Sequence, residues 1–192
     1  MLANGYSATG VDDICRDARV SKGSFYHQFA SKEELAIAAL GDFYETGLQH
    51  LLAIDVSDVA PERRFLAFLG AVSQQGHDFW KHGCLIGSLA SEMALTSQAL
   101  QSAVSRLFSE TAKALEPLID PFVASLESGS ASAPALAEHF LVVVEGGIVM
   151  SRAHDDPNKI DRAVARFAEQ LRWLAPEKPS GARKPGKKAP KR

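Results

Sequence analysis

The chain has 192 residues, a net charge of −2, and 46% hydrophobic and 23% charged residues, which is an ordinary globular composition. This composition excludes collagen-like, mucin-like and wholly disordered chains, and two cysteines are too few for a disulfide framework. The sequence shows no signal-peptide pattern, and its longest uninterrupted apolar stretch, Phe140–Val144, is far short of a membrane span, so we expect a soluble cytoplasmic protein with no membrane segment.

Basic residues are concentrated at the C-terminal end. Lys178–Arg192 contains seven Lys or Arg residues and no acid, so this segment carries a charge of +7. Because the net charge of the chain is −2, residues 1–177 carry −9. Pro, Gly and Lys dominate this end, and we expect residues 177–192 to be a disordered basic tail that could add sequence-independent affinity for DNA. Because the rest of the chain is acidic, specific DNA binding has to depend on a local motif.

Apolar residues recur at helical spacing throughout the chain, and no alternating run predicts a strand, so the expected fold class is all-α. The first predicted helix has its stripe at positions i, i+3, i+4 and i+7: Val11, Ile14, Cys15 and Ala18. Thr9 and Asp12 are placed as its capping box, and the helix should end near Arg19.

Two more helices are expected to follow closely. Ser21 can cap the second helix, with Val20 and Phe25 forming a hydrophobic staple. Ser31, followed by acidic residues in the first turn, predicts a capping box for a third helix that continues to about Leu52.

The remaining two thirds of the chain also predict helices. Pro61 should begin one that extends to about Gly76, Cys84–Leu95 forms the next, and Ser97 caps a longer one. Two prolines are expected to kink or divide this longer helix: Pro117 and Pro121.

The last two predicted helices follow a Gly, Ser and Ala linker at Ser128–Pro134. Leu136–Met150 is apolar on nearly every side, so it has to be covered either within one subunit or by dimerisation, together with the last helix, as a four-helix bundle. The last helix is expected to begin at Asp156 and Pro157 and to be closed by Pro176.

The first two helices, joined by a tight turn, form the helix-turn-helix pattern, in which the second helix enters the major groove of DNA. At about 100° per residue, Phe25 and Phe29 share one face of Lys22–Phe29 and should pack inward. The opposite face surrounds Gly23, whose missing side chain would let the backbone approach the bases. The residues expected to contact DNA are Thr9, Ser21, Lys22, Gly23, Ser24, Tyr26, His27 and Lys32.

These segments resemble a known family. Residues 20–35, VSKGSFYHQFASKEEL, resemble the recognition helix and following helix of the TetR/AcrR family of transcriptional regulators, and residues 5–20 resemble its second helix. GCLIGSLASEM at residues 83–93 and EGGIVMSRAHDDP at residues 145–157 resemble parts of the ligand-binding domain in one branch of the family. The resemblance implies a homodimer, a small-molecule pocket in the C-terminal domain and repression that the ligand relieves.

The resemblance also has a departure. Members of the family have a full helix before the Gly-Tyr pair that stands here as Gly5 and Tyr6, so the first helix of the DNA-binding domain is expected to be largely missing from this sequence. Either the start was assigned too far downstream, which the otherwise intact motif favours, or the protein is truncated. If the protein is truncated, Val11, Ile14 and Phe25 should lose part of their cover.

We therefore expect a helix-turn-helix domain at residues 1–47, a helical ligand-binding and dimerisation domain at residues 48–176, and the tail. The expected function is a repressor that a small molecule releases from operator DNA. The alternative is a helical dimer that binds a ligand or a protein and has lost DNA binding through truncation. The sequence contains no nucleophile elbow, phosphate loop, metal box or paired carboxylates, so neither an enzyme nor a cofactor is predicted.

Candidate ligand-binding residues are aromatic or polar side chains within the apolar helices, where ordinary core packing is the competing interpretation. They are Phe79, Trp80, Cys84, Ser88, Glu92, Phe108, Phe140 and Glu145. Cys84 could be a reactive sensor with His82 lowering its pKa, although a small buried filler is favoured. His77, His82 and Cys84 lack the spacing of a metal site, so no metal is predicted.

Overall fold

The computed structural model describes residues 1–2, 4–93, 97–126 and 131–174. Over these residues the chain forms eight α-helices and no strand, which confirms the all-α prediction. The helices are α1 (Val11–Ala18), α2 (Lys22–Gln28), α3 (Lys32–Leu52), α4 (Pro61–Phe79), α5 (Leu85–Met93), α6 (Gln98–Ala124), α7 (Ala133–His154) and α8 (Asn158–Leu174). The predicted tail, Pro176 and the first part of the predicted linker lie outside the described residues, whereas Pro134 lies in the first turn of α7.

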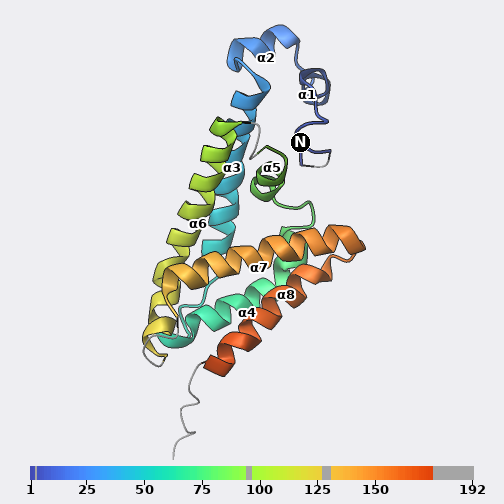
Figure 1. Cartoon of the computed structure of the whole chain (residues 1–192). Helices are drawn as coiled ribbons and strands as arrows, with labels where there is room; N and C mark the ends of the chain where they lie inside the picture. The colour runs from blue at the N-terminus through green and yellow to red at the C-terminus, as the bar shows by residue number, and fades with distance from the viewer. Residues whose placement is uncertain (3, 94–96, 127–130, 175–192) are drawn as a thin grey trace, which may run out of the picture.

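The helices form an elongated molecule with α1 and α2 at one end (Figure 1). The long helices α3 and α6 pack side by side and lead from that end to a cluster of α4, α7 and α8, with α5 beside them. Phenylalanine rings fill the core of this cluster: Phe65 lies 5.9 Å from Phe122 and 6.3 Å from Phe167, and Phe68 lies 5.6 Å from Phe140. The core therefore lies in the C-terminal part of the chain.

The predicted serine and threonine caps are present in three of four cases. The hydroxyls of three serines accept N–H groups one turn later, at 3.0–3.1 Å, as predicted for Ser21, Ser31 and Ser97. The Thr9 prediction is wrong: α1 is capped at Gly10, whose N–H donates to the Asp13 carboxylate at 3.0 Å. Thr9 is buried instead, and its hydroxyl donates to the carbonyl of Gly5 at 2.6 Å.

Two other local predictions need correction. The helix α6 continues through Pro117 and Pro121 rather than dividing at them. Pro117 is exposed, so the carbonyl that loses its N–H partner can bond water, while Ile119 and Phe122 on the other side are fully buried and hold the helix in place. Val20 is 45% exposed and does not form the predicted buried staple.

The helix α7 also qualifies the exclusion of a membrane segment. Its length and its mean hydropathy of 1.5 over the most apolar window are sufficient for a membrane span by composition alone. In the fold α7 packs against α6 and α8, and Phe140, Val144 and Ile148 on it belong to the buried core. The structure therefore uses α7 as a core helix.

Candidate nucleic-acid interface and ligand cavity

The helix α2 is anchored by one buried aromatic side chain. Phe25 is 4% exposed, and its ring lies 5.1 Å from Tyr26 and 5.9 Å from Phe29, centroid to centroid. Phe29 is half-buried and lies just beyond the helix with an extended backbone, so it is not the helical partner of Phe25 that the sequence predicted. Phe25 therefore fixes which face of α2 points outward.

The outward face carries six of the eight residues predicted to contact DNA: Ser21, Lys22, Gly23, Ser24, Tyr26 and His27. The ammonium of Lys22 lies 2.6 Å from the carboxylate of Asp12, which ties α2 to α1 and raises the pKa of the lysine. A Cβ atom at Gly23 would meet only the Ser21 hydroxyl, at 3.6 Å. Nothing inside the protein thus requires glycine in this helix, where glycine costs up to about 1 kcal/mol relative to alanine. A close approach by DNA would explain it.

The structure gives Thr9 and Lys32 another role than the predicted phosphate contacts. The ammonium of Lys32 donates to the carbonyls of Tyr6 and Thr9 at 2.9 and 3.0 Å, and it lies 4.1 Å from the centre of the Tyr6 ring. The side chain of Thr9 is turned inward, as described above. Lys32 holds the segment before α1 onto the start of α3, and the Thr9 side chain bonds within that segment, so we withdraw both as DNA contacts.

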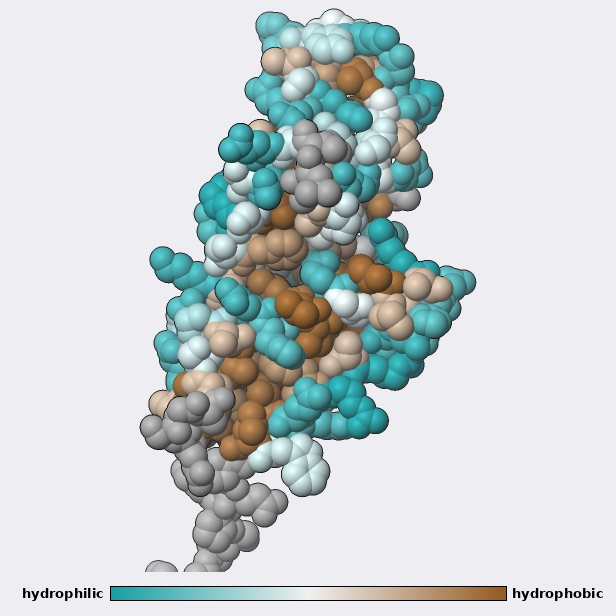
Figure 2. All heavy atoms as spheres, in the orientation of Figure 1, coloured by the Kyte–Doolittle hydropathy of each residue, from teal (hydrophilic) through white to brown (hydrophobic). Residues whose placement is uncertain are grey.

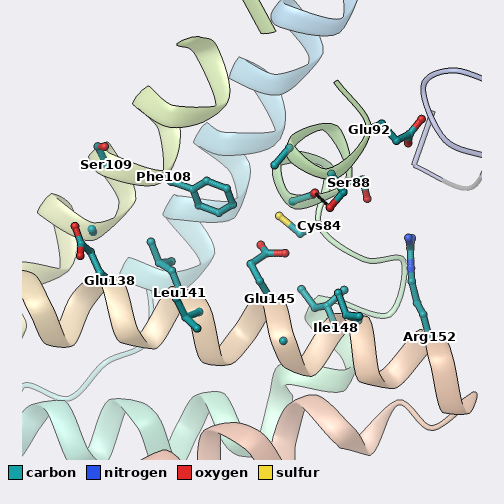
Figure 3. A pocket seen from close by; sticks show the side chains of 17 residues that line it. Cys84, Ser88, Glu92, Phe108, Ser109, Glu138, Leu141, Glu145, Ile148 and Arg152 are labelled. Carbon is teal, nitrogen blue, oxygen red and sulfur yellow. Dashed lines mark hydrogen bonds between the residues drawn. The ribbon is translucent and has the colours of Figure 1, made fainter. Parts of the chain in front are cut away.

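A cavity of about 850 Å³ lies between α5, α6 and α7 (Figure 3). It is lined by five of the predicted ligand-binding residues: Cys84, Ser88, Glu92, Phe108 and Glu145. The lining residues on α7 that sequence reasoning missed include Glu138, Leu141, Ile148 and Arg152. They continue the helical spacing of Glu145 by three or four residues at a time, so extending that stripe along α7 would have found them.

The other three predicted residues lie elsewhere. Trp80 and Phe140 line a second cavity of about 60 Å³, which shares Cys84, Phe108 and Glu145 with the larger one. Phe79 lines neither cavity: it is 37% exposed and its ring packs edge-on against Trp80. The prediction for Phe79 is therefore wrong, because a helical stripe does not say which neighbour covers a residue at the end of the helix.

Glu145 and Cys84 meet at the boundary of the two cavities. The carboxylate of Glu145 points to the thiol of Cys84 (Figure 3). Burial raises the pKa of Glu145, and burial together with the Glu145 charge raises the pKa of the Cys84 thiol. A reactive cysteine has to be a thiolate, so this environment speaks against Cys84 as a sensor and for a buried filler.

The considered metal ligands do not assemble. His77 directs Nδ1 to the carboxylate of Asp161 on α8, at 2.6 Å. In the part of the chain that the structure describes, no three His, Cys, Asp or Glu side chains are grouped as metal ligands.

Glu92 connects the cavity to the DNA-binding end. Its carboxylate accepts the backbone N–H groups of Tyr6 and Ser7, at 3.1 and 2.9 Å, and the Ser7 N–H is the main cause of the lowered pKa of Glu92. Gly5 makes this approach possible: its φ is +83°, and a Cβ atom there would lie 2.9 Å from a Glu92 oxygen. A lining residue of the cavity thus holds the segment that precedes α1.

Arg152 makes a second connection from the opposite wall. Its guanidinium donates to the carbonyl of His82 at 2.8 Å and to that of Leu2 at 3.2 Å. In Figure 3, Glu92 and Arg152 lie at the side of the cavity nearest the N-terminal segment.

Comparison with known proteins gives matches over both parts of the chain. Residues 1–39 match the family described as bacterial regulatory proteins, tetR family, and residues 63–166 match the C-terminal domain of LmrA/YxaF-like transcriptional regulators. The chain is 32% identical to the transcriptional regulator AcuR of Cereibacter sphaeroides, over 89% of this chain and 80% of AcuR. It is 30% identical to the transcriptional repressor DhaR of a Mycobacterium species, over 88% of this chain and 85% of DhaR.

Solved structures show the same architecture. The regulatory protein TetR from Rhodobacter sphaeroides superposes with a TM-score of 0.73 at 28% identity, covering 88% of this chain and 91% of that one. The reduced form of Escherichia coli NemR also gives a TM-score of 0.73, covering 91% and 90%, and its 21% identity shows a shared fold.

Proposed function

Since this chain belongs to the TetR family and is a DNA-binding transcriptional regulator, not an enzyme, we propose that it is a cytoplasmic homodimeric repressor that a small molecule releases from its operator. One observation carries the proposal: the 850 Å³ cavity is lined by Glu92, which also holds the segment next to the outward-facing helix-turn-helix. The family match over residues 1–39 favours this function over a module without DNA binding.

The surface of α7 and α8 supports dimerisation. Val142 and Val149 are 66% and 62% exposed, and Trp173 near the end of α8 is 90% exposed. An open groove of about 530 Å³ lies between α7 and α8 on this side, lined by Val142, Gly146 and Met150 among others. Exposed apolar patches of this kind mark interfaces, and two such helices from each subunit would form a four-helix bundle. The dimer would place its two α2 helices about 34–36 Å apart, or a multiple of that.

The dimer is tested by placing a charge in this surface. Met150→Arg, in the groove and outside the ligand cavity, should convert the dimer into a monomer, because it would bury an unpaired guanidinium against the partner. Gln49→Arg, on the exposed side of α3, adds the same charge and should leave the protein a dimer. Sedimentation velocity reads out both variants, and a dimeric Met150→Arg protein would rule this interface out.

Release from DNA would follow from movement of α5 relative to α7. A ligand that enters between them and displaces α5 also displaces Glu92, and with it the Tyr6 and Ser7 backbone. Lys32 passes this shift to the start of α3 because it bonds the same segment. A coupling of about 1–3 kcal/mol, typical of allosteric proteins, would change operator affinity about 5- to 150-fold.

Operator recognition is tested by titrating duplexes from its own and neighbouring promoters, and an unrelated duplex, at two salt concentrations. We expect one promoter to bind about a thousandfold more tightly than the unrelated duplex, with both affinities falling as salt rises. His27→Ala on the outward face should reduce that ratio, while Asp42→Ala on the exposed surface of α3 should not. Equal affinity for every duplex would reject a specific operator.

The coupling route is tested with Glu92→Gln. The amide retains the shape of the carboxylate but leaves one of the two N–H groups without an acceptor, so the ratio of operator affinities without and with effector should shrink about fivefold or more. Glu138→Gln neutralises another carboxylate of the same cavity and should leave the ratio unchanged. If the two variants change this ratio equally, Glu92 does not couple the cavity to the DNA-binding end.

A further inference from the structure

We propose that the effector is an amphiphilic organic cation, with its positive head group beside Glu145 and its apolar body along the larger cavity. This inference rests on the proposed function, because it names the ligand class of the same cavity. It is carried by the charges that line the cavity, by the position of Glu145, and by the aromatic residues around the smaller cavity.

The charge of the lining is negative. Three carboxylates border the larger cavity, from Glu92, Glu138 and Glu145, against a single guanidinium, from Arg152. That guanidinium donates to two backbone carbonyls, and Glu92 in turn accepts two backbone N–H groups, so both already have partners. Glu138 is exposed, so water screens its charge, and Glu145 is the carboxylate that a ligand inside the cavity would meet. An anionic ligand would therefore meet a repulsive field, and a cation an attractive one.

Of the three carboxylates, Glu145 would be stabilised most by a cationic ligand. It projects from the middle of α7 into the region shared by both cavities, and its partner there is the Cys84 thiol, a weak donor. Gly87 on α5 makes room for it, because a Cβ atom at that position would overlap the carboxylate. Removing a carboxylate from water is costly without a strong partner, and a bound cation would supply one.

Aromatic side chains surround the same point. The smaller cavity, which Glu145 borders, is lined by Phe43, Tyr44, Trp80, Phe108 and Phe140. Aromatic faces attract ammonium groups through their quadrupole, and aromatic residues combined with a carboxylate are suited to an organic cation. The volume of about 60 Å³ exceeds that of a water site several times and suits a compact head group.

The larger cavity suits the apolar remainder of such a ligand. Its 850 Å³ falls in the range of sites for drug-sized molecules, and Leu141 and Ile148 flank Glu145 on the same stripe of α7. A head group at Glu145 therefore leaves an apolar wall on either side for the body of the ligand.

Calorimetric titration of the full chain with three matched probes tests the charge preference. The probes are benzyltrimethylammonium, its neutral isostere neopentylbenzene, and the anion 3-phenylpropionate. We expect the cation to bind about tenfold more tightly than the neutral probe and the anion to bind most weakly. Glu145→Gln should abolish the preference for the cation, whereas Glu138→Gln, at an exposed position of the same cavity, should largely retain it. Thermal melting verifies that both variants are folded.

The pH dependence gives a second readout in the unmodified protein. Benzyltrimethylammonium keeps its charge at every pH, so its affinity should fall as pH is lowered through the raised pKa of Glu145, and Glu145→Gln should lack this step. The other groups facing the site are Cys84, Tyr44, Glu92, Glu138 and Arg152. The pKa of Glu92 is lowered, so its step comes at lower pH, and Glu138→Gln identifies any contribution from Glu138.

The outcomes separate this inference from the proposed function. If the neutral or anionic probe binds as tightly as the cation, or if Glu145→Gln leaves the preference intact, the effector class is wrong, and operator binding by the wild-type chain still supports the repressor. If the wild-type chain binds no operator specifically, the proposed function fails whatever the probes do.

Discussion

The two ends of the molecule are held together in different ways. Over the described residues before α3, only Tyr6, Thr9, Cys15 and Phe25 are buried. The helix α6 alone buries nine residues of the C-terminal core. Figure 2 shows the same contrast on one face: hydrophilic residues dominate the end with α1 and α2, and hydrophobic residues gather over the opposite half. The DNA-binding end is positioned by a few polar contacts, so it can be reoriented without disturbing the core.

At the DNA-binding end, the module formed by α1 and α2, polar contacts replace apolar packing because few of its apolar side chains are buried. Val11 and Ile14, which the sequence analysis expected to lose cover, are half-buried, while Phe25 keeps its cover. Lys32 and Glu92 both bond the backbone of the short segment before α1, at Tyr6–Thr9. The module thus depends on its connections to α3 and α5.

The largest expected effect is in the C-terminal core. Phe65→Ala removes a fully buried ring that contacts Phe122 and Phe167, and should lower the free energy of unfolding by about 3–5 kcal/mol. Urea denaturation followed by circular dichroism measures it. Phe79→Ala removes the same ring at a partly exposed position, and a loss as large there would contradict the assignment of the core.

An intermediate, local effect is expected at the DNA-binding end. Phe25→Ala should destabilise the module by about 3 kcal/mol, because it removes the ring that anchors α2. Hydrogen exchange should speed up in α1 and α2 and remain slow in α4 and α8, and operator affinity should fall more than tenfold. Uniformly faster exchange would show that the two ends unfold together.

The smallest effect has opposite signs for stability and binding. Gly23→Ala should raise helix stability by about 0.5–1 kcal/mol and nevertheless weaken operator binding, since the new methyl group would face the DNA. Gly41→Ala is the matched control. A Cβ atom at Gly41 would meet nothing within 4 Å beyond its neighbours in the helix, and this residue lies on α3, away from the proposed DNA-binding face. Melting curves and fluorescence anisotropy read both variants. Unchanged operator affinity in Gly23→Ala would remove the reason given for this glycine.

Sequence reasoning succeeded where the determining interactions are local. The serine caps at Ser21, Ser31 and Ser97 involve residues three positions apart, and all three are present. It failed where a distant segment decides: Lys32 looks like a free cation in the sequence, but its acceptors lie 23 and 26 residues earlier in the chain.

The cavity shows the same limit. Phe79 and Phe108 are both aromatic residues in helical segments, and only the second lines a cavity. Helical spacing determines which residues share a face, but the packing of α5, α6 and α7 determines which face surrounds empty space. That packing depends on the whole domain, so a single stripe does not reveal it.

Val142 and Gly146 border both the ligand cavity and the open groove between α7 and α8. If a ligand occupies the cavity and the groove forms the dimer interface, as we propose, this shared wall would make subunit association and effector occupancy interdependent equilibria, in which each changes the midpoint of the other. The effector level at which the genes switch on would then vary with how many copies of the regulator a cell contains.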